Sequence, residues 1–257
     1  MMETFWSPRD VFLALVFIGI TIGLLVKKPQ SANDKEVVKT YFNTVGFDRW
    51  KRIYGNDTVN SVQADIRQGH QQTIDQVLNW LHQDGNLAQT TVCDVGCGVG
   101  SLSLPLAQAG AKVSASDISS KMVEQAQSQA PDANNPQFQV ADLESVTGKY
   151  DVVVCLDVLI HYPLEDAQRM IRHLASLSTD RLILSFAPKT LFYDLLKKIG
   201  SLFPGASKAT RAYLHPEKEI RQILQAEGFQ IDREGMNKTR FYFSRLLGAS
   251  RQSAGKD

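Results

Sequence analysis

A glycine-rich segment is the part of this sequence best suited to chemistry. Three glycines, Gly96, Gly98 and Gly100, stand at every second position directly after an apolar run. Glycines at this spacing allow a tight turn and let a ligand approach the backbone closely. Asp117 stands at the end of the next expected strand, where a carboxylate can accept hydrogen bonds from both hydroxyls of a ribose. The segment therefore predicts a site for a nucleoside-containing cofactor.

The aspartate that precedes the glycines favours one class of cofactor. A dinucleotide site has the spacing Gly-x-Gly-x-x-Gly and places a pyrophosphate at a helix N-terminus. Here the glycine spacing differs, and Asp94 precedes Gly96. A carboxylate at this position repels a pyrophosphate and attracts a cation. We therefore predict S-adenosylmethionine, with its amino-acid end held by Asp94 and the glycine backbone. A glycine-rich turn without a ligand is the alternative.

Five further residues are candidates for the cofactor site. We expect Ile118 to pack on the adenine and Asp142, beside Leu143, to accept a hydrogen bond from the adenine amino group. Aspartate also caps turns and helices, which is the alternative role for Asp142. Asp157 follows the fourth expected strand, where the cofactor and substrate clefts of such a fold meet. Cys97 lies among the glycines and is interpreted as a small packing residue rather than a nucleophile.

Two residues are candidates for catalysis, and two more tyrosines are candidates for binding the substrate. His161 follows the fourth expected strand, and ligands bind outside the carboxyl ends of such strands. It could be a general base, a hydrogen-bond donor to a carboxylate, a ligand of a metal in the substrate, or a structural residue. Tyr54 and Tyr41 lie in expected helices that could cover the site, where they point into the cleft or simply pack. Tyr162 adjoins His161.

Residues 189–215 mix aromatic and cationic side chains around a Pro-Gly pair. A large, flat, apolar substrate that carries carboxylates would suit such a wall. We therefore place Lys208, Arg211 and Tyr213 in the substrate site. An amphipathic helix with a solvated face is the alternative.

The expected elements alternate between strands and helices. This alternation predicts an α/β fold with a Rossmann-like, doubly wound, mostly parallel seven-stranded sheet whose last strand is antiparallel. The expected strands are 91–95, 112–116, 137–140, 150–156, 181–187, 229–234 and 240–246. The expected helices are 73–82, 101–108, 119–129, 165–176, 191–202 and 216–227.

An uncharged apolar run, 11–26, lies near the N-terminus and is followed by two lysines. As a helix it would be about 24 Å long, against about 30 Å for the hydrocarbon core of a bilayer, and the flanking lysines can absorb the difference. We predict a single membrane anchor with its lysines on the cytoplasmic side. A signal peptide and a buried helix are the alternatives.

The chain thus divides into five predicted parts. They are a membrane anchor at 1–28, a linker at 29–36, a helical lid at 37–87, a methyltransferase core at 88–247 and a flexible tail at 248–257.

Composition excludes some partners. The chain of 257 residues has a formal net charge of +1, without the basic stripe of a nucleic-acid-binding domain, so no nucleic-acid partner is predicted. Its three cysteines, Cys93, Cys97 and Cys155, show neither a pairing framework nor metal-ligand spacing with histidines. This pattern predicts a reducing compartment and no metal site.

Taken together, these residues resemble the magnesium-protoporphyrin IX O-methyltransferases of chlorophyll and bacteriochlorophyll synthesis, which are class I enzymes dependent on S-adenosylmethionine. The resemblance runs from about Val37 to Leu247. Its cofactor motifs are shared by many methyltransferases, whereas the expected lid and residues 203–213 are its specific part. The matching segments are 41–43, 46–50, 53–55, 65–67, 69–70, 93–100, 115–119, 142–145, 155–163, 182–189, 202–205 and 207–213.

The resemblance implies methyl transfer to the C13 propionate of magnesium protoporphyrin IX, which gives the monomethyl ester. A propionate is ionised at neutral pH, so catalysis would rest on positioning and on exclusion of water. His161 and Tyr54 would orient the acceptor, or His161 would bind the porphyrin magnesium. The resemblance also implies a contact with the porphyrin-binding subunit of magnesium chelatase. With the anchor, it places the catalytic domain on the cytoplasmic or stromal side of a plasma or thylakoid membrane.

Two other functions stay open. A methyltransferase for another membrane-associated acceptor, such as a quinone or phenol, would need a base, and His161 would then be required. A non-catalytic porphyrin carrier or scaffold would not need Asp117. The complete set of glycines and aspartates argues against the scaffold.

Overall fold

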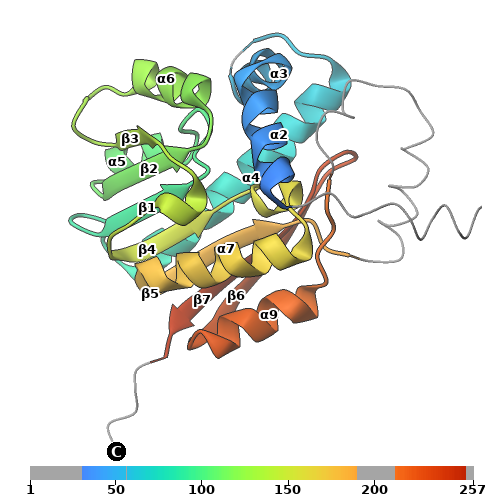
Figure 1. The fold of residues 1–257 in the computed structure, drawn as a ribbon. Helices are drawn as coiled ribbons and strands as arrows, with labels where there is room; N and C mark the ends of the chain where they lie inside the picture. The colour runs from blue at the N-terminus through green and yellow to red at the C-terminus, as the bar shows by residue number, and fades with distance from the viewer. Residues whose placement is uncertain (1–30, 56, 190–211, 253–257) are drawn as a thin grey trace, which may run out of the picture.

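In the computed structural model, residues 31–55, 57–189 and 212–252 are described, and a seven-stranded sheet runs through them (Figure 1). The strand order is β3-β2-β1-β4-β5-β7-β6. Neighbours among the first five strands pair in parallel, and β7 pairs antiparallel with both β5 and β6. This arrangement confirms the predicted Rossmann-like sheet and its antiparallel end. The strands are β1 (Thr91–Val95), β2 (Lys112–Asp117), β3 (Gln137–Val140), β4 (Tyr150–Cys155), β5 (Ser178–Phe186), β6 (Phe229–Lys238) and β7 (Phe243–Arg251).

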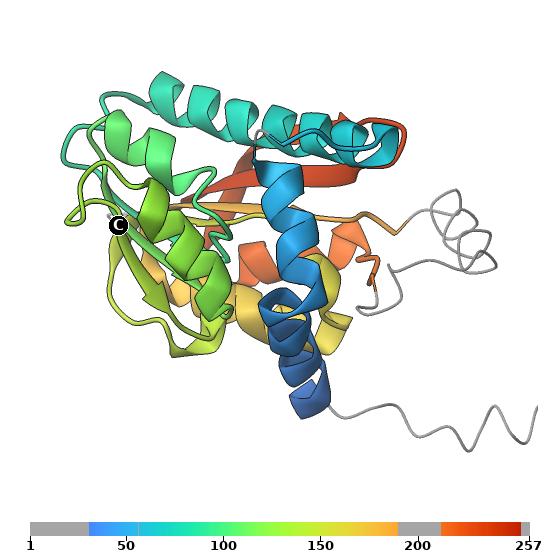
Figure 2. The same ribbon diagram turned by 90° about the horizontal axis from the view of Figure 1, so that it is seen from above.

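Helices cover both faces of the sheet, as Figures 1 and 2 show. On one face lie α4 (Ser61–Asp84) and α5 (Ser103–Gln108), and on the other lie α7 (Leu164–Leu177) and α9 (Glu217–Ala226). Helix α6 (Ser120–Gln129) packs on β2 and β3. Two short 3-10 helices, η1 (Leu143–Ser145) and η2 (Leu159–His161), follow β3 and β4.

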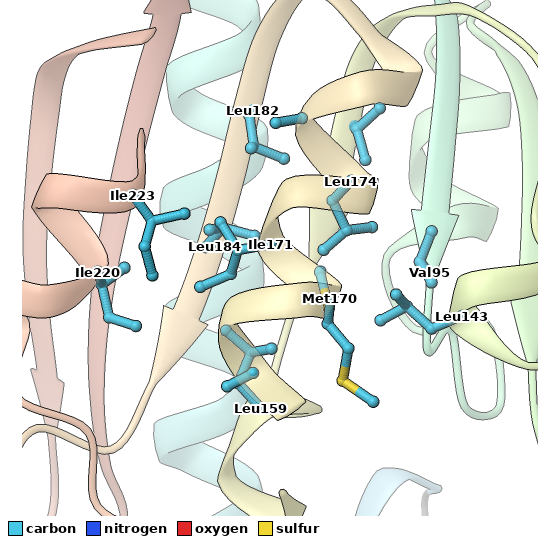
Figure 3. Packing of buried hydrophobic residues seen from close by; sticks show 14 of the residues in the cluster. Val95, Leu143, Leu159, Met170, Ile171, Leu174, Leu182, Leu184, Ile220 and Ile223 are labelled. Atoms are coloured by element: carbon cyan, nitrogen blue, oxygen red, sulfur yellow. The ribbon is translucent and has the colours of Figure 1, made fainter. Parts of the chain in front are cut away.

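The two faces of β4 belong to two separate apolar clusters. Val152 and Val154 pack in the cluster that includes Trp80 of α4, whereas Val153 packs in the cluster that includes Leu174 of α7. Successive side chains of a strand point to opposite faces, so an unbroken apolar strand fills both clusters. Figure 3 shows the α7 side, where Leu174 lies among apolar side chains of α7, α9 and the strands.

Helices α2 (Ser31–Asn43) and α3 (Val45–Tyr54) lie beside the sheet at the end where the parallel strands finish (Figure 2). Asn43 ties α2 to the start of α6, because its Oδ1 accepts hydrogen bonds from the hydroxyls of Ser119 and Ser120 at 3.0 and 3.2 Å. The N-terminal helices therefore stand over the carboxyl edge of the sheet.

The predicted N-terminal boundaries were wrong in two places. Helix α2 begins at Ser31, so most of the predicted linker 29–36 is helical. Helix α4 packs on the sheet through Trp80 and its apolar neighbours, so the predicted boundary between a lid at 37–87 and a core at 88–247 divides one packed unit. Its long apolar face contacts β6 and β7, which the sequence pattern alone did not reveal.

The predicted flexible tail 248–257 was also wrong over its first residues. Strand β7 continues to Arg251, and Ala249 is fully buried. The predicted anchor 1–28 and helix 191–202 lie outside the described residues. Among the described ranges, no helix is both long and apolar enough to cross a bilayer.

Candidate functional site

A cavity of about 530 Å³ opens at the carboxyl ends of the parallel strands. Its walls come from the segments that follow each of the five parallel strands, from α2, α3 and α4, and from the start of β7. This is the edge at which doubly wound sheets bind their ligands.

The glycine loop after β1 forms the floor of this cavity. Gly96 has φ +81°, a conformation that side chains rarely adopt, and a Cβ added there would lie 2.1 Å from Cγ2 of Val158. The backbone amide of Gly98 donates to Oδ2 of Asp117 at 3.0 Å, which joins the loop to the end of β2. Gly100 has φ +85° and does not line the cavity, so it serves the turn itself.

Two buried aspartates give this floor a negative character. Burial raises the pKa of Asp94 to about 6, although the hydroxyl of Ser103 donates to its carboxylate at 2.5 Å. Burial also raises the pKa of Asp117, against hydrogen bonds from the amides of Ser119 and Gly98. No lysine lines the cavity within the described residues to neutralise them. Buried carboxylates in this state suit a ligand that brings its own positive charge and hydroxyl groups, as S-adenosylmethionine does.

The pKa of Asp94 predicts a pH dependence of cofactor binding. A cation binds the ionised form of Asp94, whose fraction falls from about 0.9 at pH 7 to about 0.1 at pH 5 when the pKa is about 6. We expect the affinity for S-adenosylmethionine to fall about tenfold between pH 7 and pH 5, as measured by calorimetry. The uncharged ligand adenosine and the variant Asp94→Asn are the controls and should show a much flatter profile. An equal affinity of the wild type at both pH values would contradict this assignment.

A row of aromatic rings crosses the cavity from α3 to α4. The Trp50 ring stacks on the Tyr54 ring with 5.3 Å between centroids, and the Tyr54 ring lies 4.3 Å from that of His70. A Cβ added to Gly98 would lie 4.0 Å from the Tyr54 ring, so this ring stands next to the glycine loop. Burial, together with the charges of Asp157 and Asp117, raises the pKa of Tyr54 well above its usual value. Tyr54 therefore stays a neutral phenol that can donate a hydrogen bond.

His161 lines the same cavity at the end of η2. Burial lowers the pKa of His161 to about 4, although the negative charge of Asp157 opposes the shift. Its Nδ1 is buried and has no hydrogen-bond partner among the described residues, and its ring packs edge-on against Phe42 at 5.3 Å. At neutral pH the side chain is an uncharged imidazole with a free polar atom, which suits a hydrogen bond or a bond to a metal better than proton abstraction.

Asp157 follows β4, the strand beside β1, and is a centre of hydrogen bonds in the cavity wall. It is a non-glycine residue with φ +57°, a strained conformation of the kind found at functional sites. Its carboxylate pairs with Nδ1 of His70 at 3.0 Å and accepts from the Tyr242 hydroxyl at 2.9 Å and the Ser185 hydroxyl at 2.9 Å. Although burial opposes ionisation, these hydrogen bonds and the charge of His70 lower the pKa of Asp157.

Close packing brings Tyr242 to this carboxylate. A Cβ added to Gly69 on α4 would lie 2.4 Å from the Tyr242 ring, so only glycine leaves room for that ring. The Tyr242 hydroxyl also lies 3.0 Å from Oγ1 of Thr73, on the next turn of α4. Because Asp157 already has several protein partners, its most direct structural role is to hold His70 and Tyr242; its predicted contact with the cofactor stays a prediction.

Most of the predicted site residues meet at the cavity. The two candidate catalytic residues line it, and so do most of the predicted cofactor residues and two predicted substrate residues. The lining residues are Tyr54 and His161; Asp94, Gly96, Cys97, Gly98, Asp117, Ile118, Leu143 and Asp157; and Tyr41 and Tyr162. Cys97 is buried, and burial raises the pKa of its thiol well above the usual value, in keeping with a packing role.

Other predicted residues lie elsewhere. Asp142 is not part of the cavity wall; it caps η1 by accepting from the amide of Glu144 at 3.0 Å, and it pairs with Lys35 of α2 at 2.8 Å. Tyr213 does not line the cavity either, because its hydroxyl donates to Asp34 at 3.2 Å, while its neighbours Ala212 and Leu214 face the cavity. Lys208 and Arg211 lie outside the described residues.

Sequence reasoning assigned no role to several cavity residues. His70 had a local signal, since it stands in a segment that carries the family resemblance, but no spacing paired it with Asp157. Tyr242 and Phe241 reach the cavity from the β6–β7 turn, and Arg49 reaches it from α3. Their positions depend on how distant segments pack, so the local pattern did not identify them.

The sheet order, the glycine loop and the buried acidic floor define an S-adenosylmethionine-dependent methyltransferase, and a general methyltransferase domain model matches residues 92–180. A second model, for the magnesium-protoporphyrin IX methyltransferase C-terminus, matches residues 155–251. The magnesium-protoporphyrin O-methyltransferase of Synechocystis sp. is 62% identical over 223 residues, covering 85% of this chain and 97% of that protein. The chain therefore belongs to the magnesium-protoporphyrin IX methyltransferase family.

Two further comparisons agree with this membership. The chloroplastic magnesium protoporphyrin IX methyltransferase of Arabidopsis thaliana is 59% identical over 221 residues, which cover 84% of this chain and 71% of that protein. The crystal structure of the Synechocystis enzyme with bound S-adenosylhomocysteine aligns with a TM-score of 0.79 and 61% identity, over 85% of this chain and 100% of that one. That relative binds the demethylated cofactor.

Proposed function

We propose that this protein transfers a methyl group from S-adenosylmethionine to the C13 propionate of magnesium protoporphyrin IX, giving the monomethyl ester in chlorophyll biosynthesis. The observation that carries the proposal is the pair of neutral side chains, Tyr54 and His161, in one cavity. The floor of that cavity, with its glycine loop and two aspartates, suits the cofactor. The names of the relatives, which are magnesium-protoporphyrin methyltransferases, support the choice of porphyrin.

An acceptor that is already ionised fits these two residues best. A propionate has a pKa near 4 in water, so at neutral pH no proton has to be removed. A phenol has a pKa near 10, and a histidine with a pKa of about 4 is a weak base for it. Tyr54 can donate a hydrogen bond to the propionate without changing its own protonation state. The site therefore favours a carboxylate over a quinol or phenol.

The cofactor supplies a methyl group bonded to a positively charged sulfur. Asp94 and the glycine loop would hold its amino-acid end, and Asp117 its ribose, while Ile118 and Leu143 would pack against the adenine. Tyr54 and His161 would orient the propionate, or His161 would bind the porphyrin magnesium. Catalysis would then come from alignment and from the exclusion of water by the aromatic side chains and the bound macrocycle.

A turnover assay tests this function. The full chain would receive labelled S-adenosylmethionine and one of three acceptors: magnesium protoporphyrin IX, metal-free protoporphyrin IX or a catechol. We expect label in a monomethyl ester of the magnesium compound, and a rate for it that changes little between pH 6.5 and pH 8.5. A preference over the metal-free porphyrin would support a magnesium contact such as His161. Label in the catechol alone would reject the proposal.

The remaining features concern closure and location. Helices α2 and α3 would act as a lid, because their residues Tyr41, Trp50 and Tyr54 line the cavity and Asn43 joins α2 to the start of α6 through a hydrogen bond.

We further propose that residues 1–28 anchor the protein in a thylakoid or plasma membrane, with the catalytic domain on the stromal or cytoplasmic side. A chloroplastic relative is consistent with the thylakoid. Handover from the porphyrin-binding subunit of magnesium chelatase would suit a sparingly soluble substrate.

A further inference from the structure

Arg49 of α3 is the one arginine or lysine that lines the cavity within the described residues. Its guanidinium lies 5.7 Å from the centre of the Trp50 ring, and it makes no ion pair or hydrogen bond with any residue of the described ranges. Arg52, on the same helix, instead donates its Nε to the carbonyl of Asp48 at 3.1 Å. Arg49 is therefore a positive charge at the cavity whose hydrogen-bonding capacity is not used by the part of the chain that the structure describes.

The other charged groups of the cavity make this cation significant. Asp94, Asp117 and Asp157 all line it, so an anionic substrate meets carboxylates on its way in. A porphyrin with two propionates brings two negative charges. The positive sulfur of the cofactor can balance the propionate that reacts. The second propionate needs a cation of its own, because without one it would lie near the carboxylates of the cavity with no positive charge to balance it.

The aromatic row places Arg49 away from the reacting position. Tyr54 stands over the glycine loop, Trp50 stacks on Tyr54, and the guanidinium of Arg49 lies against Trp50 on α3. A flat macrocycle can lie along this row with one propionate at Tyr54 and another at Arg49. The planar guanidinium matches a carboxylate in a two-point hydrogen bond, which also fixes orientation.

We propose that Arg49 binds the propionate that is not methylated and thereby determines which of the two becomes the ester. This inference rests on the proposed function, because it names a contact of the same substrate. Arg49 acts as a specificity-determining residue: it holds one carboxylate so that only the other reaches the methyl donor. The reaction then stops at the monomethyl ester.

The test combines a protein change with a substrate change. The variants are Arg49→Gln and Arg49→Lys, with Arg52→Gln as the matched control on the same helix. The substrates are magnesium protoporphyrin IX and its analogue with a neutral amide in place of the second propionate. For Arg49→Gln we expect a 10- to 100-fold higher KM for the natural substrate, a kcat within about threefold of wild type and an unchanged Kd for S-adenosylmethionine.

Two further readouts separate binding of this propionate from a structural effect. The wild type should lose a similar factor in KM with the amide analogue, and Arg49→Gln should not discriminate between the two substrates. Arg49→Lys should recover part of the loss, because it keeps the charge without the two-point geometry. Mass spectrometry and NMR of the product of Arg49→Gln should show dimethyl ester and the ester of the other propionate.

Several outcomes would overturn the inference. A weaker Kd for S-adenosylmethionine with an unchanged porphyrin KM would show that Arg49 binds the carboxylate of the cofactor instead. If Arg49→Gln and the amide analogue each raise KM and the two factors multiply when they are combined, the second propionate does not bind Arg49. If Arg49→Gln does not fold, the comparison of the two substrates on the wild type still decides whether that propionate is bound. Failure of the wild type to esterify the natural substrate would reject the proposed function itself, which is a separate result.

Discussion

Replacing Gly96 by alanine is expected to lower the affinity for S-adenosylmethionine at least 100-fold. The new Cβ would lie 2.1 Å from Cγ2 of Val158, far inside the contact distance, and the residue would be strained at φ +81°. Because the next residues of the loop carry the backbone that faces the cofactor, any shift that relieves this collision also displaces the binding surface. Calorimetry with S-adenosylhomocysteine measures the loss without turnover.

Gly110→Ala is the matched control for this experiment. Gly110 also has a positive φ, +95°, but its nearest neighbour atom, Cα of Ala88, would lie 3.4 Å from the new Cβ, and the residue is not part of the cavity wall. It should share the backbone strain of about 1–2 kcal/mol in stability while leaving cofactor affinity unchanged. Adding Val158→Ala to Gly96→Ala removes the colliding atom and should restore part of the affinity. Cofactor binding by Gly96→Ala within about fivefold of wild type would contradict the assigned role of the loop.

Replacing Tyr54 by phenylalanine is expected to lower kcat for magnesium protoporphyrin IX by up to about 100-fold, because the propionate would no longer be held in line with the methyl donor. The Tyr54 hydroxyl forms no hydrogen bond with a described residue, so it is available to a ligand. The ring contacts with Trp50 and His70 should remain, so the melting temperature and the Kd for S-adenosylmethionine should stay close to wild type. Steady-state kinetics and calorimetry together check this expectation.

The pH profile and a control tyrosine sharpen the interpretation. The pKa of Tyr54 is raised well above its usual value, so wild-type kcat should show no loss of a phenol proton up to about pH 9. Tyr150→Phe is the control: its hydroxyl donates to the carbonyl of Thr147 at 3.0 Å, and it lies outside the cavity wall. An unchanged kcat in Tyr54→Phe would show that the hydroxyl does not orient the acceptor. A fall in kcat shared equally by Tyr150→Phe would point to a general loss of packing.

The sheet and the cofactor loop could be predicted from the sequence because both follow from short segments. The predicted strands 91–95 and 137–140 match β1 and β3 residue for residue. Strand β3 is mostly exposed, and its sequence Gln-Phe-Gln-Val alternates polar and apolar residues. A buried parallel strand such as β1 is a mostly apolar run, and the positive φ after it favours glycine, so both can be predicted from neighbouring residues. The same holds for Asp94 and Asp117, which the strand ends carry to one edge.

The N-terminal helices show where local patterns stop being informative. The apolar face of α4 predicts a helix, yet the pattern cannot say whether that face covers a ligand or packs on a sheet. In the structure α4 does both, because Trp80 and its neighbours pack on β-strands, whereas Ile66, His70 and Ile74 line the cavity. Tyr213 likewise carries a hydroxyl suited to a substrate, but its partner is Asp34 of α2.

By itself, the sequence therefore determined the class of fold and the cofactor, since the strand patterns and the glycine loop are local, and it predicted Tyr54 and His161 as the residues that orient the acceptor. Only the tertiary structure decided which other side chains meet at the cavity. Asp157, His70 and Tyr242 come from three separate segments, and they meet because the antiparallel β6–β7 pair returns beside α4. Arg49 stands at the cavity, without an ion pair to any described residue, because α3 lies over the strand ends. Contacts of this kind depend on how distant elements pack, and no spacing along the chain encodes that packing.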